Sequence, residues 1–241
     1  MASRLIASGL QRLGSVLAPV ELDGQRLDPD TRAMLVAYRV FPTLDSQGPV
    51  KARVSLARTA GLVLPGRVEL PEVSEIVGPC PMRLYRPGPG RAGLLFFHGG
   101  GFVVGDLDSH DTICRLLAQR SGRTVVAVDY RLAPEHPFPA ALEDALSAWR
   151  WFVESAPSLG LDPEQLAVAG DSAGAMLSTL IGLQLSEDEP APERQVLIYP
   201  AADRSGRDET RSRQLFGRDF LLTNQLTDWF LDLYAHGHDL A

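Results

Sequence analysis

A serine flanked by glycines, in the segment GDSAG at residues 170–174, separates an apolar run from a helical pattern. The segment has the form G-x-S-x-G, in which a sharp strand-to-helix turn presents the serine hydroxyl above a sheet. A serine at such a turn lies at a helix N-terminus, where the helix dipole favours negative charge. We therefore predict that Ser172 is a nucleophile for acyl transfer.

Three consecutive glycines follow another apolar run, in LLFFHGGGFVVGD at residues 94–106. Glycine adopts positive φ readily and lets backbone N–H groups approach a ligand closely. Acyl transfer through a serine builds an oxyanion that needs fixed hydrogen-bond donors in a dry site. We predict that the N–H groups of Gly100, Gly101 and Ala173 form this oxyanion hole. We expect His98 and Gly99 to support the loop, because they precede the donors.

The elements that must position these motifs are strands and helices in alternation. Helical patterns at about 108–120, 141–155 and 173–186 follow three of the apolar runs, and the segments EVSEIV and PMRLYRP predict a β-hairpin across GPC. Continuous apolar runs predict strands buried on both faces, as in a parallel sheet. The order of elements predicts an α/β fold with a mostly parallel, doubly wound sheet. The four apolar runs are GLLFF from 93, TVVAV from 124, LAVAG from 166 and QVLIY from 195.

The segment before the sheet contains signals for helices. Residues 1–20 contain no acidic residue and fit one stripe of an amphipathic helix, with a faint similarity to an organelle transit peptide as the alternative. Asp28 as N-cap and Pro29 at the first helical position predict a second helix. Residues 42–67 contain several glycines and prolines without clear periodicity, so we predict a linker there.

Composition excludes several classes of partner. A net charge of −7 and a pI near 5.2 over 241 residues argue against nucleic acid or an anionic membrane, since both select a basic face. No apolar stretch approaches the length of a membrane span, so we expect no stable membrane insertion. Cys80 and Cys114 are too few for a disulfide framework and stand in no metal-ligand cluster. We predict a cytoplasmic protein with no metal.

Three segments together carry a specific resemblance: HGGGF at 98–102, DYRLAPEHPFPAALEDA at 129–145 and GDSAG at 170–174. With LDPDTRAML near the start and LIYPAAD after the fourth apolar run, the chain resembles the hormone-sensitive-lipase-like branch of the α/β-hydrolase family over most of its length. The resemblance implies hydrolysis of carboxylic esters of small or medium acyl chains through an acyl-enzyme on the serine. It implies a small-molecule ester as the substrate and no cofactor.

The resemblance also implies a domain organisation. Residues 1–45 are expected to form N-terminal cap helices, residues 46–203 the hydrolase core, and residues 204–241 a cap insertion helix. The family usually continues GDSAGGN, whereas this chain has Ala175 and Met176, which leaves the packing behind the turn open. Residues that could line an acyl pocket, with core packing as the alternative for each, are Phe102, Phe216, Phe220, Leu221 and Trp229.

Several charged residues near the motifs are predicted to be structural. A proline-rich loop must satisfy its own backbone groups, and an arginine paired with a carboxylate does so. We expect such roles for Arg131, Glu135, His136 and Asp144. We expect His110 to be an exposed helix residue.

The acid and base that should accompany the serine are not evident. The family order is Ser, Asp, His, with the last two after further strands that this sequence does not contain. Asp203, His236 and His238 are the internal candidates, the two histidines following a helix with its N-cap at Thr223. We expect an incomplete form that lacks the last strands of the core and is inactive in an ordinary assay, since losing the histidine costs about 10⁶ in turnover.

Other functions stay open at this point. The same family includes a plant hormone receptor without the catalytic histidine, so a non-catalytic, receptor-like protein that binds small molecules is the main alternative. Hydrolysis of amides or carbamates on the same machinery is another. A homo-oligomer, or a C-terminal fragment missing from this chain, would complete the sheet.

Overall fold

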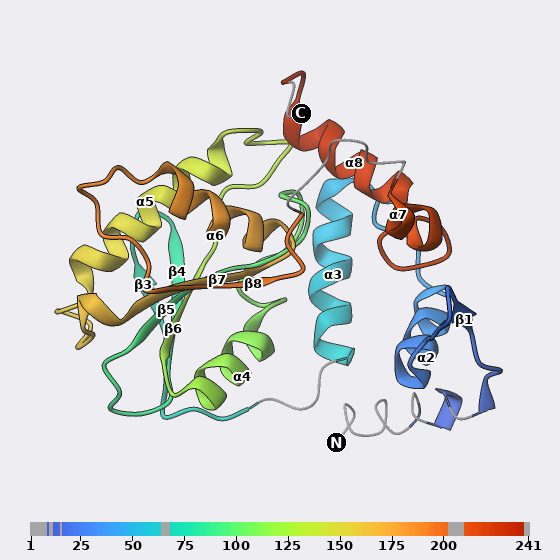
Figure 1. The fold of residues 1–241 in the computed structure, drawn as a ribbon, viewed down its shortest axis with the longest axis horizontal. Coiled ribbons are helices and arrows are strands. Elements are labelled where there is room, and N and C mark those ends of the chain that lie inside the picture. Colours follow the sequence, from blue (N-terminus) through green and yellow to red (C-terminus); the bar gives the residue numbers. More distant parts are fainter. Residues whose placement is uncertain (1–8, 10–11, 15, 64–67, 202–209, 239–241) are drawn as a thin grey trace. The chain divides into compact units, whose positions relative to one another are not determined.

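The computed structural model describes residues 9, 12–14, 16–63, 68–201 and 210–238. The chain forms two compact units (Figure 1). One contains residues 1–66 and 204–229, and the other contains residues 67–203 and 230–241. The candidate site lies in the second unit.

The second unit is built on a six-stranded sheet with the strand order β3-β4-β6-β5-β7-β8. The strands β6, β5, β7 and β8 run parallel to one another, and β3 and β4 form the predicted antiparallel hairpin at one side. Helices α5 and α6 cover one face and α4 the other (Figure 1). The prediction of a mostly parallel, doubly wound sheet is therefore confirmed. The strands are β3 Glu72–Val77, β4 Pro81–Arg86, β5 Gly93–Phe97, β6 Thr124–Val128, β7 Leu166–Asp171 and β8 Arg194–Ile198.

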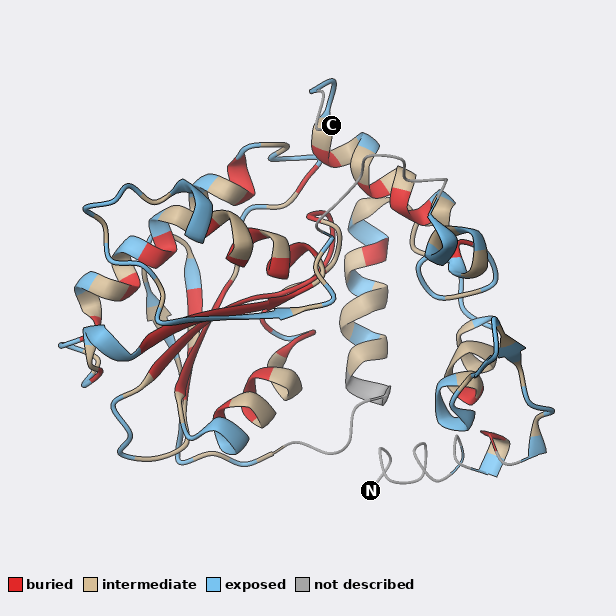
Figure 2. Ribbon diagram, viewed as in Figure 1, coloured by how far each residue is buried: buried red, intermediate tan, exposed pale blue. Residues whose placement is uncertain are grey.

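The three central strands form the core of this unit. Every residue of β5, β6 and β7 is buried, as the continuous apolar runs predicted (Figure 2). Successive side chains of a strand point to opposite faces, so Phe96 and Phe97 anchor the two layers of helices. Burial of each such side chain stabilises the fold by about 1.5–3 kcal/mol. The two glycine motifs therefore begin at the carboxyl ends of fully buried strands, β5 and β7.

The prediction that the fourth apolar run is buried on both faces is wrong for the described chain. Val196 is 45% exposed and Leu197 is 37% exposed. The reason is topological, since β8 is last in the strand order and pairs with β7 along one edge. Within the described residues no strand pairs with its other edge.

The predicted helices of this unit are present. They are α4 Asp111–Ser121, α5 Ala140–Ser155 and α6 Ala173–Gln184, and a short 3-10 helix, η1, spans Pro163–Gln165. Helix α4 begins three residues later than predicted, because residues 106–109 form a turn closed by their own side chains. In this turn the Asp106 carboxylate accepts from the Ser109 N–H and the Ser109 hydroxyl oxygen accepts from the Asp106 N–H. Helix α4 ends at Gly122, whose φ of 70° is typical of a C-cap.

The first unit contains helix α2, Pro29–Tyr38, which begins as predicted. Asp28 caps it, its carboxylate accepting from the Thr31 N–H at 2.9 Å. A small hairpin that the sequence analysis missed, β1 Glu21–Leu22 with β2 Gln25–Arg26, turns through an Asp-Gly pair with positive φ. The predicted helix over residues 1–20 falls largely outside the described residues.

The prediction of a linker over residues 42–67 is wrong. Helix α3, Pro49–Val63, occupies most of it. Gly48 has a φ of 74° and Pro49 takes the first helical position, so these two residues start the helix rather than interrupt one. The segment that follows contains three Ala, two Leu and two Arg, which favour helix.

The C-terminal helices are α7 Arg211–Phe216 and α8 Asn224–Ala235. The predicted N-cap at Thr223 is confirmed, since its hydroxyl accepts from the Leu226 N–H at 3.1 Å. The last six residues of α8 belong to the unit that contains the sheet. In the described part of the chain, no helix is both long enough and apolar enough to cross a membrane.

The exposed edge of β8 predicts self-association, because unpaired N–H and C=O groups beside apolar side chains are a template for strand pairing. We expect the 241-residue chain to form oligomers as its concentration rises, and Val196→Lys to reduce this. Light scattering after size exclusion measures it. Val50→Lys, at a 67% exposed position on α3, is the matched control and should associate like the parent. A parent chain that stays monomeric at every concentration would contradict the prediction.

Candidate active site

Ser172 occupies a strained turn between β7 and α6. Its φ of 52° and ψ of −116° lie in a region that costs a non-glycine residue about 1–3 kcal/mol. Its N–H donates to the carbonyl of Ile198 at 2.9 Å, and its carbonyl accepts from the N–H of Met176 at 3.1 Å. Within the described residues its Oγ makes no hydrogen bond. The hydroxyl is therefore left for a ligand or another partner.

The flanking glycines are required by close packing, as predicted. A Cβ on Gly170 would overlap the backbone of Gly174, and a Cβ on Gly174 would overlap the carbonyl of Phe97 at the end of β5. Ala175, the first of the two residues that depart from the family pattern, is fully buried. The turn and the end of β5 thus touch backbone to backbone.

The glycine loop after β5 adopts conformations that favour glycine. The φ angles of Gly100 and Gly101 are 128° and 60°. The Gly100 carbonyl accepts from the N–H groups of Val103 and Val104 at 3.1 and 3.0 Å. In the described part of the chain, the N–H groups of Gly100, Gly101 and Ala173 donate no hydrogen bond. Two backbone N–H groups of the loop and one of the turn are therefore left without an acceptor in the described part of the chain.

The end of α8 packs on this loop. A Cβ on Gly101 would overlap the ring of Phe230. The ring of Phe102 stacks on that of Tyr234 with centroids 4.0 Å apart, and the Tyr234 carbonyl accepts from the N–H of Phe138 at 2.8 Å. Aromatic side chains thus bound the loop on its outer side.

His98 is buried beneath the loop, with 2% of its surface exposed. Its Nδ1 lies 2.9 Å from the Gly99 carbonyl, so Nδ1 carries the proton and donates. Its ring stacks on that of Tyr130 at 4.3 Å, and the Tyr130 hydroxyl donates to the His98 carbonyl at 2.7 Å. Burial, reinforced by nearby His110, lowers the pKa of His98 to about 4. The imidazole is neutral at physiological pH.

Asp171, which the sequence analysis did not assign to the site, joins the serine turn to the glycine loop. Asp171 Oδ1 accepts from the Gly99 N–H at 2.9 Å and lies 3.5 Å from Nε2 of His110. The Tyr199 hydroxyl donates to Oδ2 at 3.4 Å. Burial raises the pKa of Asp171, but the hydrogen bonds and charges of His110 and the Gly99 N–H outweigh it and hold the pKa below its usual value.

The expectation that His110 is an exposed helix residue is wrong. It is 9% exposed and stands at the N-cap position of α4, with its ring turned to Asp171. Its place at a helix start, rather than on the outer face of a helix, explains the difference. For Asp171 the signal was available, since side chains alternate along a strand and the residue before the serine must point another way.

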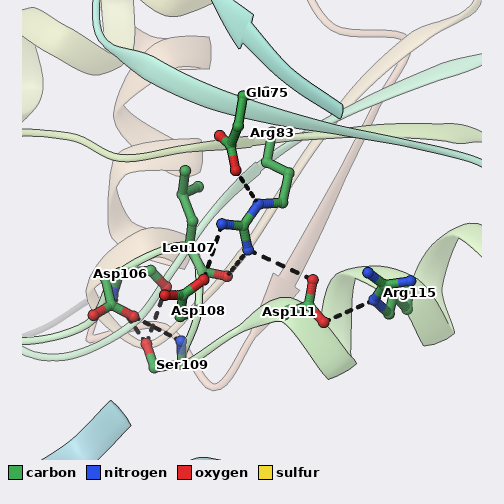
Figure 3. A network of polar contacts seen from close by, with 8 residues as sticks. All are labelled: Glu75, Arg83, Asp106, Leu107, Asp108, Ser109, Asp111 and Arg115. Atoms are coloured by element: carbon green, nitrogen blue, oxygen red, sulfur yellow. Dashed lines mark hydrogen bonds and ion pairs between the residues drawn. The ribbon is translucent and has the colours of Figure 1, made fainter. Parts of the chain in front are cut away.

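An arginine on β4 fixes the segment that carries His110 (Figure 3). Arg83 donates to Glu75 Oε1 at 2.7 Å, to the Leu107 carbonyl at 3.2 Å and to Asp108 Oδ1 at 2.9 Å. It also lies 3.6 Å from Asp111, the first residue of α4. The guanidinium thus joins Glu75 of β3 to the middle of the turn and to the first residue of α4.

The charged residues of the 129–145 loop include the predicted structural pair. The carboxylate of Asp144 accepts from the backbone N–H and the guanidinium of Arg131 at 2.8–3.0 Å, and Glu143 adds a contact at 3.1 Å. Glu135 and His136 are exposed. The Arg131–Asp144 pair secures the loop that follows Tyr130.

The structure does not bring the other candidates to Ser172. His236 and His238 are exposed after α8, and His238 packs edge-on to Phe138 with ring centroids 5.6 Å apart. Asp203 lies outside the described residues. Of the predicted pocket residues, Phe102 is in the unit of Ser172, whereas Phe216, Phe220, Leu221 and Trp229 are in the other. Among the described residues no group of three or more His, Cys, Asp or Glu side chains could hold a metal ion.

Comparisons with known proteins give a consistent picture. A family described as alpha/beta hydrolase fold matches residues 94–241. An ethyl acetate hydrolase of Pseudomonas putida is 52% identical over 162 residues, covering 64% of this chain and 50% of that protein. A carboxylic ester hydrolase of Mycobacterium tuberculosis is 40% identical over 98% of this chain and 66% of its own length. The chain thus spans between about half and two thirds of these relatives.

Solved structures agree. An ester hydrolase from the metagenome of Lake Arreo, complexed with a derivative of bipyridine phosphonate, superposes with a TM-score of 0.78 at 36% identity, over 85% of this chain and 69% of that one. A hyperthermophilic esterase from Pyrobaculum calidifontis gives 0.75 at 35% identity, over 86% and 70%.

The buried His98 predicts a dependence of stability on pH. Between pH 6.5 and about 4 the unfolded state binds a proton that the folded state excludes, so the free energy of unfolding should fall as pH falls, by up to about 1.4 kcal/mol per unit. His98→Asn should flatten this slope. Urea unfolding of both proteins between pH 6.5 and about 4 measures the slope. At pH 8, where the imidazole is neutral in both states, the difference in the free energy of unfolding between parent and variant reports the packing lost in the variant. An unchanged slope in the variant would contradict the prediction.

Proposed function

Because the chain belongs to the α/β-hydrolase fold family, we propose that it hydrolyses carboxylic esters through Ser172, as a member of the hormone-sensitive-lipase-like branch. One observation carries the proposal. Ser172 stands on a strained turn between a buried strand and a helix, and in the described chain neither its hydroxyl nor the N–H groups of Gly100, Gly101 and Ala173 make a hydrogen bond. The Gly-x-Ser-x-Gly turn and the HGGG loop are two of the three segments on which the resemblance to the branch rests.

In the proposed reaction the Ser172 hydroxyl oxygen attacks the ester carbonyl carbon. A base removes its proton, and the tetrahedral oxyanion is bound by the N–H groups of Gly100, Gly101 and Ala173. Each such donor lowers the barrier by about 3–4 kcal/mol. Collapse of the intermediate breaks the ester bond, and the protonated base donates its proton to the departing alkoxide. Water then attacks the acyl-enzyme by the same steps and releases the acid and free Ser172.

The hydrogen bonds of the loop support the placement of these donors. Two consecutive peptide planes are held: Tyr130 donates to the His98 carbonyl, Asp171 accepts from the Gly99 N–H, and His98 Nδ1 donates to the Gly99 carbonyl. The Gly99 carbonyl and the Gly100 N–H belong to one rigid plane. His98 therefore orients the Gly100 N–H by fixing the opposite side of that plane, which is the supporting role we propose for His98 and Gly99.

The base is proposed to come from a histidine other than those near the site. His98 Nδ1 donates to Gly99, and His110 Nε2 faces Asp171. This chain covers 50% and 66% of the length of the two relatives compared above. Without a base, catalysis by the hole and substrate binding alone is about 10³–10⁴ over water.

The proposed substrates are small-molecule esters with small or medium acyl chains. Phe230 against Gly101, and Phe102 stacked on Tyr234, place apolar rings beside the loop. The absence of a histidine contact to Ser172 in the described chain favours one second candidate, a binding protein without catalysis. We also propose a cytoplasmic location, since Cys80 and Cys114 form no disulfide.

The nucleophile is tested with full-length protein. We expect it to hydrolyse p-nitrophenyl butyrate and to react with a fluorophosphonate probe, and Ser172→Ala to lose both, with activity falling at least about 10⁴-fold. Ser178→Ala, at a buried serine on α6, is the control and should keep both. Wild-type turnover in Ser172→Ala would refute the nucleophile. A folded parent that binds esters without labelling would favour the binding protein.

The oxyanion hole is tested by removing one donor. Replacing Ala173 by lactic acid converts its N–H to an ester oxygen, and we expect kcat to fall by about 10²–10³ with little change in KM. The same replacement at Ala92, whose N–H also makes no hydrogen bond in the described chain, is the matched control. Equal kcat for the two esters would remove Ala173 from the hole.

A further inference from the structure

The contact between His110 and Asp171 points to an indirect effect of His110 on the glycine loop. We propose that His110 is a positioning residue that holds the Asp171 carboxylate on the Gly99 N–H and thereby keeps the glycine loop in its donor geometry. The inference rests on the proposed function and adds a residue that touches neither the substrate nor Ser172.

The backbone around His110 is held on several sides. The turn over residues 106–109 is closed by the bonds between Asp106 and Ser109, and Arg83 binds the Leu107 carbonyl and the Asp108 carboxylate within it (Figure 3). Asp111 is joined to Arg115, whose guanidinium is buried and donates to the Val68 carbonyl. His110 therefore stands on a fixed support, and its ring is placed by backbone that cannot follow Asp171 if the contact is lost.

The hydrogen bond at Nδ1 and the nearby carboxylate at Nε2 select which ring nitrogen of His110 carries the proton. Nδ1 lies 3.0 Å from Ser109 Oγ, and Nε2 lies 3.5 Å from Asp171 Oδ1. In the neutral ring the Ser109 hydroxyl donates to Nδ1, and in the charged ring it accepts from Nδ1 and donates to the Asp106 carbonyl instead. Both arrangements keep a proton on Nε2, toward the carboxylate. The alternative tautomer would turn a lone pair to a carboxylate oxygen.

Asp171 depends on these donors because it is buried, with 8% of its surface exposed. A buried carboxylate is stable only when it is paired and hydrogen-bonded. Its hydrogen-bond donors are the Gly99 N–H at 2.9 Å and the Tyr199 hydroxyl at 3.4 Å, and His110 Nε2 lies at ion-pair distance, 3.5 Å from Oδ1. A Cβ on Gly99 would overlap the carboxylate, so the side chain lies directly against the loop. When His110 is removed, the carboxylate turns to find another donor, and the Gly99 N–H loses its acceptor.

A change in the orientation of Gly99 is transmitted along the backbone to the proposed oxyanion hole. Gly99 precedes Gly100, and the two peptide planes that meet at Gly99 are oriented by Asp171 on one side and His98 on the other. A displacement of about 1 Å at a reacting site costs about 10² in rate. His110 therefore affects stabilisation of the transition state more than binding of the substrate.

The test compares His110→Phe, which keeps a ring without a donor, with His110→Gln, whose amide can still donate. In full-length enzyme we expect His110→Phe to lower kcat for p-nitrophenyl butyrate by about 10- to 100-fold with KM within about twofold, and His110→Gln to recover part of the loss. Inhibition by a trifluoromethyl ketone, whose adduct carries an oxyanion, should weaken in parallel. Inhibition by the matching methyl ketone should not. His136→Phe, at an exposed histidine, is the control.

A second variant tests the route through Asp171. Asp171→Asn keeps an acceptor for the Gly99 N–H without the charge. When His110→Phe is added to Asp171→Asn, we expect kcat to fall little further than in Asp171→Asn alone. If His110→Phe does not fold, the shorter His110→Asn takes its place.

The outcomes separate the two proposals. Wild-type kcat in a folded His110 variant, a loss shared equally by both ketones, or independent effects of the His110 and Asp171 substitutions would overturn the role of His110. Activity retained by Ser172→Ala would instead overturn the proposed function.

Discussion

The site depends on one contact, the backbone of the serine turn against the backbone at the end of β5. Gly174 touches the carbonyl of Phe97, and no side chain fits between them. The contact brings the N-terminus of α6 next to the glycine loop, although 70 residues separate the two in sequence. Because β5 and β7 are neighbours in a fully buried part of the sheet, the distance between the two motifs is set by strand spacing.

Charge and hydrogen bonding then set orientation within that fixed distance. A neutral His98 and an ionised Asp171 hold consecutive peptide groups of the loop from opposite sides. Their pKa values move in the directions that these roles need, since burial keeps the imidazole neutral while its neighbours keep the carboxylate charged. Arg83 on β4 in turn binds the segment that carries His110, through Asp108, and joins it to Glu75 on β3. The loop is thus oriented by side chains that are not themselves donors of the proposed oxyanion hole.

The sequence predicted the parts of this arrangement that local pattern determines. Apolar runs predicted the buried strands, and single residues predicted the N-caps at Asp28 and Thr223. The flanking glycines predicted the turn at Ser172. The start of α3 was misread because glycine and proline mark both linkers and helix starts. The roles of His110 and Asp171 depend on which strands are neighbours, and the exposure of β8 depends on what pairs with its outer edge. Which strands are neighbours is decided by the tertiary fold, so a short stretch of sequence does not show it.

The central claim is that Ser172 and three backbone N–H groups form one acyl-transfer site. The most direct measurement is a crystal structure of the full-length protein after reaction with a p-nitrophenyl phosphonate, whose adduct mimics the tetrahedral intermediate. The account predicts phosphorus bonded to Ser172 Oγ and one phosphonyl oxygen within about 3 Å of the nitrogens of Gly100, Gly101 and Ala173. A phosphonate bonded to another residue, or an oxygen that points away from these three nitrogens, would contradict it.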